Sequence, residues 1–258
     1  MRRSARFSIF RRRAVAALCP LLAGLVLLGC DQRPEPPSVS PPAPPGNSRD
    51  GFSERLGTDG AAQSERASHP SADDRPRIVA FGDSLTAGLG VAPEDSYPAH
   101  LQRRLDTAGY RYRVINAGIS GETTAGGLRR VPWILQSRPS LVILELGGND
   151  GLRGLNVEET RSNLEQIIER LLAEKVPVVL AGMKLPPNYG ADYTSRFEAI
   201  YPELAKTYGL TLIPFFLEGV AAKATLNQAD GIHPTGEGYR LIAENIFRTI
   251  APLLAEPP

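Results

Sequence analysis

Five short runs of apolar residues recur along the chain from residue 78 onward, and turn-forming residues follow each of them. The runs cover residues 78–81, 112–115, 141–144, 178–180 and 211–213. They are rich in leucine and β-branched residues. Continuous apolar runs of this length are typical of strands that are covered on both faces of a sheet. We therefore expect these runs to form the strands of one sheet.

The segments between these runs have helical spacing. Apolar residues follow an i, i+3, i+4, i+7, i+8 pattern at Leu164, Ile167, Ile168, Leu171 and Leu172, and a second stripe lies at Tyr239, Ile242, Ile246 and Ile250. Weaker patterns predict helices over residues 98–106 and 130–136. Strands that alternate with helices predict an α/β fold, in which helices cover both faces of a parallel sheet. Ligands of such sheets bind at the carboxyl ends of the strands.

The N-terminal region has a different pattern. Arginines cluster before the first acidic residue, Asp31, and residues 14–28 form an apolar run that is shorter than the about 20 residues of a membrane span. A basic start followed by an apolar run is typical of a secretory signal. The run ends in Leu27-Leu28-Gly29-Cys30, which resembles the bacterial lipobox. We expect residues 1–29 to be a lipoprotein signal peptide and Cys30 to carry lipid. A stray cysteine, a single-pass anchor and a twin-arginine signal at residues 11–13 are alternatives.

Residues 30–75 have too few large apolar residues to build a core. The stretch begins rich in proline and continues rich in serine, glycine and charge, so we expect a disordered Pro-rich tether. The globular domain then covers residues 76–258. These features predict an exported, membrane-anchored lipoprotein that faces the periplasm, or alternatively a secreted periplasmic protein.

Composition narrows the chemistry of the globular domain. The chain has two cysteines, and Cys19 would leave with the signal peptide while Cys30 would be acylated. A cysteine nucleophile, a zinc–cysteine site and a redox pair are thereby excluded from the catalytic part. The formal net charge of +1 does not favour nucleic acid as a partner.

One of the three histidines is the candidate general base. His69 lies in the expected tether, and His100 lies in an expected helix away from any strand end. His233 follows Asp230 by three residues, with a glycine between them that lets the carboxylate fold back onto the imidazole and fix its tautomer. Ser84 directly follows the first strand and Gly-Asp. A serine hydroxyl needs an adjacent base to act as a nucleophile, and the alternative is that this serine or the aspartate before it only caps a helix.

A serine esterase also needs donors for the oxyanion of its tetrahedral intermediate. Gly121 follows the second strand, and its backbone N–H is open to a ligand because glycine lacks a Cβ. Asn149 follows the third strand and offers a side-chain amide, although Asn-Asp-Gly is also a common tight turn. The backbone N–H of Ser84 would be a third donor. The loop residues Leu146, Leu152, Leu155, Pro186 and Tyr189 either line an apolar groove or belong to the core.

Four blocks of sequence together resemble the GDSL, or SGNH, hydrolases. They are Gly82-Asp-Ser-Leu85, Gly121, Gly147-Gly-Asn-Asp150 and Asp230-Gly-Ile-His-Pro234, and the similarity extends over residues 78–254. The chain looks most like the bacterial TesA-type group of thioesterases, lysophospholipases and arylesterases. This resemblance implies a flavodoxin-like α/β/α sandwich without a metal or organic cofactor.

The resemblance also implies roles for single residues. Ser84 would be the nucleophile, His233 the base and Asp230 the orienting acid, while Gly121 and Asn149 would form the oxyanion hole. The implied activity is hydrolysis of small-molecule acyl esters, namely aryl esters, acyl-CoA thioesters or lysophospholipids. Members of the group use the loop that matches residues 150–155 as a mobile cover over the acyl chain. A carbohydrate deacetylase of the same fold and a non-catalytic lipid-binding lipoprotein remain as alternatives.

Overall fold

The computed structural model describes residues 73–255 of the chain. The predicted signal peptide and Cys30 lie outside the described residues, as does nearly all of the predicted tether. These predictions therefore stay predictions. Every helix within residues 73–255 is too short or too polar to span a membrane.

The five apolar runs form a single parallel sheet. Its strands are β1 (Arg77–Gly82), β2 (Arg113–Gly118), β3 (Pro139–Glu145), β4 (Val178–Ala181) and β5 (Thr211–Ile213). They are arranged in the order β2-β1-β3-β4-β5. This is the flavodoxin-like order, in which the chain reverses its direction of travel across the sheet between β1 and β3. The predicted strands and their parallel arrangement are confirmed.

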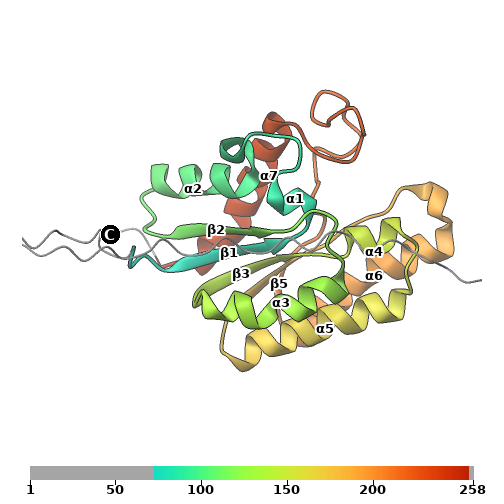
Figure 1. Ribbon diagram of the computed structural model, residues 1–258, viewed down its shortest axis with the longest axis horizontal. Helices are drawn as coiled ribbons and strands as arrows, with labels where there is room; N and C mark the ends of the chain where they lie inside the picture. The colour runs from blue at the N-terminus through green and yellow to red at the C-terminus, as the bar shows by residue number, and fades with distance from the viewer. Residues whose placement is uncertain (1–72, 256–258) are drawn as a thin grey trace, which may run out of the picture. The chain divides into compact units, whose positions relative to one another are not determined.

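Helices cover both faces of the sheet (Figure 1). On one face α2 (Tyr97–Thr107) packs beside α7 (Gly236–Ile250), and on the other α3 (Thr124–Gln136), α5 (Val157–Ala173) and α6 (Ala191–Tyr208) lie together. The short helices α1 (Ser84–Ala87) and α4 (Gly148–Leu152) follow β1 and β3. Three 3-10 turns complete the described elements: η1 (Pro93–Asp95), η2 (Pro187–Tyr189) and η3 (Ala251–Leu253).

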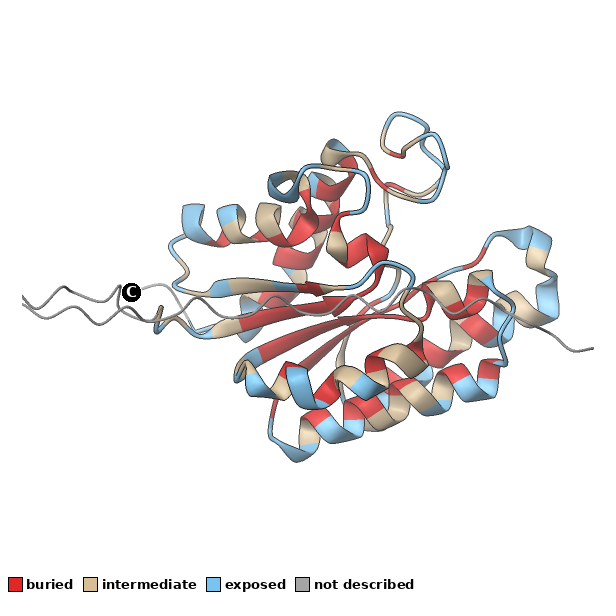
Figure 2. Cartoon of the chain, viewed as in Figure 1, coloured by how far each residue is buried: buried red, intermediate tan, exposed pale blue. Residues whose placement is uncertain are grey.

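The core lies between the sheet and these helix layers. Figure 2 shows the central strands as buried almost along their whole length, with the buried side of each helix turned toward them. The predicted helical stripes are buried as expected, except that Leu172 is only partly covered. Strand β2 lies at the edge of the sheet, so its side chains are more exposed than those of β1. The predicted α/β/α layering is therefore confirmed.

Three helices differ from the pattern-based expectation. The short helix α4 lies where a loop was expected after the third strand. Helix α3 begins at Thr124, six residues before the predicted start at residue 130, because the Thr123 hydroxyl accepts a hydrogen bond from the Gly126 N–H at 3.4 Å and caps a glycine-rich first turn. Helix α6 was not predicted. It contains Pro202, which normally interrupts a helix, but its buried apolar stripe holds it against the sheet and α5.

Candidate active site

The carboxyl ends of three neighbouring strands meet at one edge of the sheet. Ser84 follows β1, Gly121 follows β2 and Asn149 follows β3. The loop between β5 and α7 brings Asp230 and His233 to the same place. This edge is the switch point at which sheets of this order bind their ligands.

Ser84, His233 and Asp230 form a continuous hydrogen-bonded chain. The Ser84 Oγ lies 2.9 Å from the His233 Nε2, and the His233 Nδ1 lies 2.7 Å from the Asp230 Oδ2. The other oxygen of Asp230 accepts the backbone N–H groups of Ile232 at 2.9 Å and of His233 at 3.0 Å. This is the arrangement of a nucleophile, a general base and an orienting carboxylate.

The charge state of Asp230 fixes the tautomer of the imidazole. The backbone N–H of His233, together with its ring and the N–H of Ile232, lowers the pKa of Asp230 to about 2. The carboxylate is therefore ionised at neutral pH and accepts the proton on Nδ1. The Nε2 is left as an acceptor that faces the hydroxyl of Ser84.

Asp83, and not Ser84, caps the short helix α1. The Asp83 Oδ1 accepts the N–H of Leu85 at 3.0 Å. Ser84 is the first residue of the helix, so its hydroxyl is not used as a cap and can bond to His233. The alternative that the Ser84 side chain only caps a helix is therefore wrong, and the capping residue is Asp83.

Asn149 lies in the first turn of α4, and its amide is held by Asp83. The Asn149 Nδ2 donates to the Asp83 Oδ2 at 3.0 Å. Gly147 leads into α4 with a φ of 109°, and a Cβ at this position would lie 2.4 Å from the Tyr201 hydroxyl. Only glycine fits there, because both the backbone conformation and the space exclude a side chain. The position of the first turn of α4 relative to the end of β3 is therefore restricted by Gly147.

Gly121 is open toward the site and is connected to Asn149 through an arginine. Its φ is 78°, and a Cβ would meet Arg153 at 3.5 Å and, its chain neighbours aside, no other described residue within 4 Å. The Arg153 Nη2 donates to the Gly121 carbonyl oxygen at 3.0 Å and lies 3.4 Å from the Asn149 Oδ1. The structure thus brings the two predicted oxyanion residues together, as it does the three triad residues.

A second link between the same two loops was not predicted. Asp150 is buried and accepts the backbone N–H of Thr124 at 2.9 Å as well as its hydroxyl. This pair ties the start of α3 to α4. Burial raises the pKa of Asp150. The sequence shows only that both residues stand near strand ends, and it carries no sign that they pair.

A buried carboxyl pair lies beneath the nucleophile and was also missed. Glu145, the last residue of β3, is fully buried, and its Oε2 accepts the Thr86 hydroxyl at 2.8 Å and the Asp83 N–H at 3.4 Å. Its Oε1 has no partner among the described residues. Burial raises the pKa of both Glu145 and Asp83. The neighbouring Asp83 carboxylate raises the pKa of Glu145 further, whereas the hydrogen bonds from Leu85 and Asn149 oppose the rise in the pKa of Asp83.

The candidate groove residues separate into core and surface. Leu146 is fully buried and belongs to the core. Leu152 and Tyr189 are partly buried, and the Tyr189 hydroxyl donates to the Leu152 carbonyl at 2.9 Å. Leu155 and Pro186 are exposed. The last four remain available to contact a ligand.

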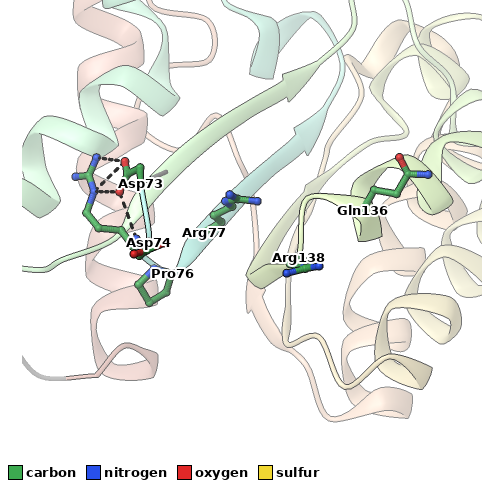
Figure 3. Close-up of a pocket in the computed structure, with 7 residues that line it drawn as sticks. Asp73, Asp74, Pro76, Arg77, Gln136 and Arg138 are labelled. Atoms are coloured by element: carbon green, nitrogen blue, oxygen red, sulfur yellow. Dashed lines mark hydrogen bonds and ion pairs between the residues drawn. The ribbon is translucent and has the colours of Figure 1, made fainter. Parts of the chain in front are cut away.

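A hollow of about 460 Å³ lies at the opposite edge of the sheet, near the amino ends of β1 and β3 (Figure 3). An ion pair between Arg75 and Asp73 at 2.7 Å lies on its rim. It contains no pair of nucleophile and base. Its lining consists of Asp73, Asp74, Arg75, Pro76, Arg77, Gln136 and Arg138. Among the described residues, no group of three or more His, Cys, Asp or Glu side chains could hold a metal ion.

Known proteins are similar to this chain in sequence and fold. The model of the GDSL-like lipase/acylhydrolase family matches residues 80–241. The esterase TesA of Pseudomonas aeruginosa is 45% identical over 178 residues, which are 69% of this chain and 89% of that protein. Thioesterase 1/protease 1/lysophospholipase L1 of Escherichia coli strain K12 is 40% identical over 69% of this chain and 84% of its own length. The solved structure of AlinE4, an SGNH-hydrolase family esterase, is 47% identical with a TM-score of 0.59, over 70% of this chain and 98% of that one.

Proposed function

The chain belongs to the GDSL-like lipase/acylhydrolase family, and on this basis we propose that it hydrolyses acyl esters through an acyl-enzyme on Ser84. That it is an acyl ester hydrolase follows from its relatives, which are named esterase and thioesterase/lysophospholipase. The observation that carries the mechanism is the 2.9 Å contact between the Ser84 Oγ and the His233 Nε2. This contact also argues against a binding protein without catalysis, which would have no need of it.

The proposed reaction has two halves. His233 takes the hydroxyl proton as the Ser84 Oγ attacks the acyl carbon, and Asp230 stabilises the imidazolium that forms. The oxyanion is stabilised by the backbone N–H groups of Ser84 and Gly121 and by the side-chain amide of Asn149. His233 then protonates the leaving alcohol or thiol. In the second half, a water molecule activated by the same imidazole hydrolyses the acyl-enzyme.

A covalent probe tests the nucleophile. A fluorophosphonate should label the protein once, on Ser84, and the Ser84→Ala variant should lose both labelling and hydrolysis. Ser120→Ala is the matched control, because Ser120 is an exposed serine in the loop that also contains Gly121. Mass spectrometry that placed the adduct on Ser120 would contradict the assignment.

The proposed substrates are aryl esters, acyl-CoA thioesters and lysophospholipids. The names of the relatives support this range, since they include thioesterase and lysophospholipase activities. A panel of p-nitrophenyl esters from acetyl to palmitoyl, with acyl-CoA and lysophospholipid beside it, should show turnover of each class. Turnover confined to acetylated carbohydrates would favour the deacetylase instead.

The proposed location is the periplasmic side of a membrane, with lipid on Cys30. The basis is the sequence around Leu27-Leu28-Gly29-Cys30 behind a basic start and an apolar run. Two or three acyl chains on one cysteine would anchor the protein firmly. The wild type should fractionate with membranes and incorporate palmitate, and Cys30→Ala should do neither. If the two proteins were equally soluble, a secreted enzyme would remain.

A further inference from the structure

An exposed arginine connects the two proposed oxyanion residues. Arg153 caps the C-terminus of α4, and its side chain reaches back toward the site. One nitrogen, Nη2, donates to the carbonyl oxygen of Gly121 at 3.0 Å and lies 3.4 Å from the Asn149 Oδ1. Both contacts are made to the ends of these residues that do not serve the oxyanion. The guanidinium therefore contacts the Gly121 and Asn149 oxygens and leaves their N–H groups free to form the proposed oxyanion hole.

These contacts fix the orientation of the Asn149 amide. Its oxygen faces the Arg153 guanidinium, and its nitrogen faces the Asp83 carboxylate at 3.0 Å. A flipped amide would set its NH₂ against a cation and its oxygen against a carboxylate, so charge on both sides excludes it. The nitrogen carries two hydrogens, and Asp83 takes one of them. The second is left for the oxyanion.

The same nitrogen holds the Gly121 peptide, which has few other supports. Apart from its two chain neighbours, Arg153 is the one described residue with a heavy atom within 4 Å of where a Cβ at Gly121 would lie. The turn around it is closed by the Glu122 N–H, which donates to the Ile119 carbonyl at 3.1 Å. Glu122 is in turn paired with Arg130 at 2.5 Å. These bonds hold the far side of the turn, and Arg153 holds the side next to α4.

We propose that Arg153 is a positioning residue for ester hydrolysis, and that it aligns the Gly121 peptide and the Asn149 amide so that both donors meet the same oxyanion. This inference rests on the proposed roles of Gly121 and Asn149. An oxyanion hole works because its donors are fixed before charge develops. Loss of the guanidinium should therefore slow turnover and leave ground-state binding of the substrate nearly unchanged.

An exposed arginine at the rim of a site would equally suit an anionic leaving group, such as the phosphates of coenzyme A. The two roles differ in their kinetics. Positioning acts on kcat for every substrate, whether neutral or charged. Recognition of a phosphate acts on KM and only for substrates that carry one.

The experiment compares Arg153→Met and Arg153→Lys with the wild type on p-nitrophenyl butyrate and on an acyl-CoA. Methionine keeps much of the aliphatic stem and removes the donors, whereas lysine keeps a charge and a donor. We expect Arg153→Met to lower kcat about 5- to 30-fold on both substrates with KM within about twofold. This is less than the roughly 10- to 150-fold that a charge-assisted hydrogen bond represents, because Arg153 is exposed to solvent. Arg153→Lys should recover part of this loss. Arg170→Met, an exposed change on α5, is the control and should stay within about twofold of the wild type.

Three results would overturn the inference. They are an unchanged kcat in Arg153→Met, a loss confined to KM on the acyl-CoA, and a lysine variant no better than methionine. Thermal unfolding checks that both variants fold, which is expected because Arg153 is exposed. Fluorophosphonate labelling separates the two proposals. If Ser84→Ala abolishes labelling and turnover but Arg153→Met behaves like the wild type, only the role of Arg153 is wrong.

Discussion

Replacing Asn149 with alanine tests the oxyanion hole most directly. The Asn149 Nδ2 carries two hydrogens, and the structure commits one of them to the Asp83 Oδ2 at 3.0 Å. Asn149→Ala therefore removes two things. It takes away the donor proposed to stabilise the oxyanion, and it deprives a buried carboxylate of one of its two hydrogen bonds.

The two losses have different magnitudes and different readouts. Loss of one oxyanion donor costs about 3–4 kcal/mol of barrier, so kcat should fall by ~10²–10³-fold with little change in KM. Loss of a hydrogen bond to the buried Asp83 carboxylate costs about 1.5–3 kcal/mol of stability. In a domain of this size that corresponds to a melting temperature lower by roughly 3–10 °C. The pKa of Asp83 should also rise further, because the Asn149 amide is one of the groups that lower it.

Steady-state kinetics on p-nitrophenyl butyrate at 25 °C, with thermal unfolding in parallel, separates these effects. Asn245→Ala is the matched control, because its amide donates to the Glu218 carbonyl at 3.0 Å from α7 and faces no catalytic residue. The control should keep its kcat. If Asn149→Ala melted earlier but kept a kcat within about fivefold of the wild type, Asn149 would only support Asp83 and its oxyanion role would be wrong.

Three further changes have defined outcomes. Asp230→Asn should leave the fold intact and lower kcat by about 10³–10⁴-fold in the same assay, because the imidazole tautomer is no longer enforced; near-normal turnover would contradict the triad. Burial raises the folded-state pKa of Glu145 above its usual 4.5, so the stability that its protonated form contributes is present below that pH and is lost as the pH rises. In urea unfolding, the free energy of unfolding of Glu145→Gln should increase relative to that of the wild type from pH 5 to 9. A difference between the two proteins that stayed constant over this range would show that Glu145 does not titrate in it. Gly147→Ala should destabilise the protein by about 2–4 kcal/mol, because the position has a φ of 109° and the added Cβ would lie 2.4 Å from the Tyr201 hydroxyl. The control Gly209→Ala, with a φ of 62° and open space around it, should cost only about 1 kcal/mol. Equal losses of the free energy of unfolding in urea would refute the clash at position 147.

The strands were predictable because burial of a strand on both faces requires a continuous run of apolar residues in the sequence. Each strand of the central sheet needs a continuous apolar run, and all five runs became strands. Helix α6 was missed although the sequence carries a local sign of it. Phe197, Ile200, Tyr201 and Leu204 follow the i, i+3, i+4, i+7 spacing of a helix and are buried against the core. Pro202 lies within this stripe and argues locally against a helix, but the packing of the stripe outweighs its cost.

The triad could be predicted in part from spacing alone. Asp230 and His233 are three residues apart, so a single turn brings them together. Ser84 lies 149 residues from His233. The sequence connected the two only because each lies in a segment that follows a predicted strand, and because both belong to the blocks that resemble the family. Glu145 was missed because its partners Thr86 and Asp83 lie 59 and 62 residues away, and Arg153 because Gly121 lies 32 residues away. A charged residue at a strand end gives no sign, in sequence, of the loop that it will contact.

The buried carboxyl pair explains why the nucleophile and the oxyanion donors stay aligned. Burying two neighbouring acids without a cation is unfavourable, and proteins keep such arrangements chiefly where function requires them. Here Asp83 caps the helix that starts at Ser84 and also holds the Asn149 amide, at 3.0 Å in each case. Glu145 in turn accepts the Asp83 N–H, which lies at the end of the neighbouring strand β1. A residue at position 82 must be glycine, since a Cβ there would lie 2.5 Å from the Glu145 carboxyl. The strand ends of β1 and β3 are thus joined through side chains, so a shift of the nucleophile would also move the donor that serves its oxyanion.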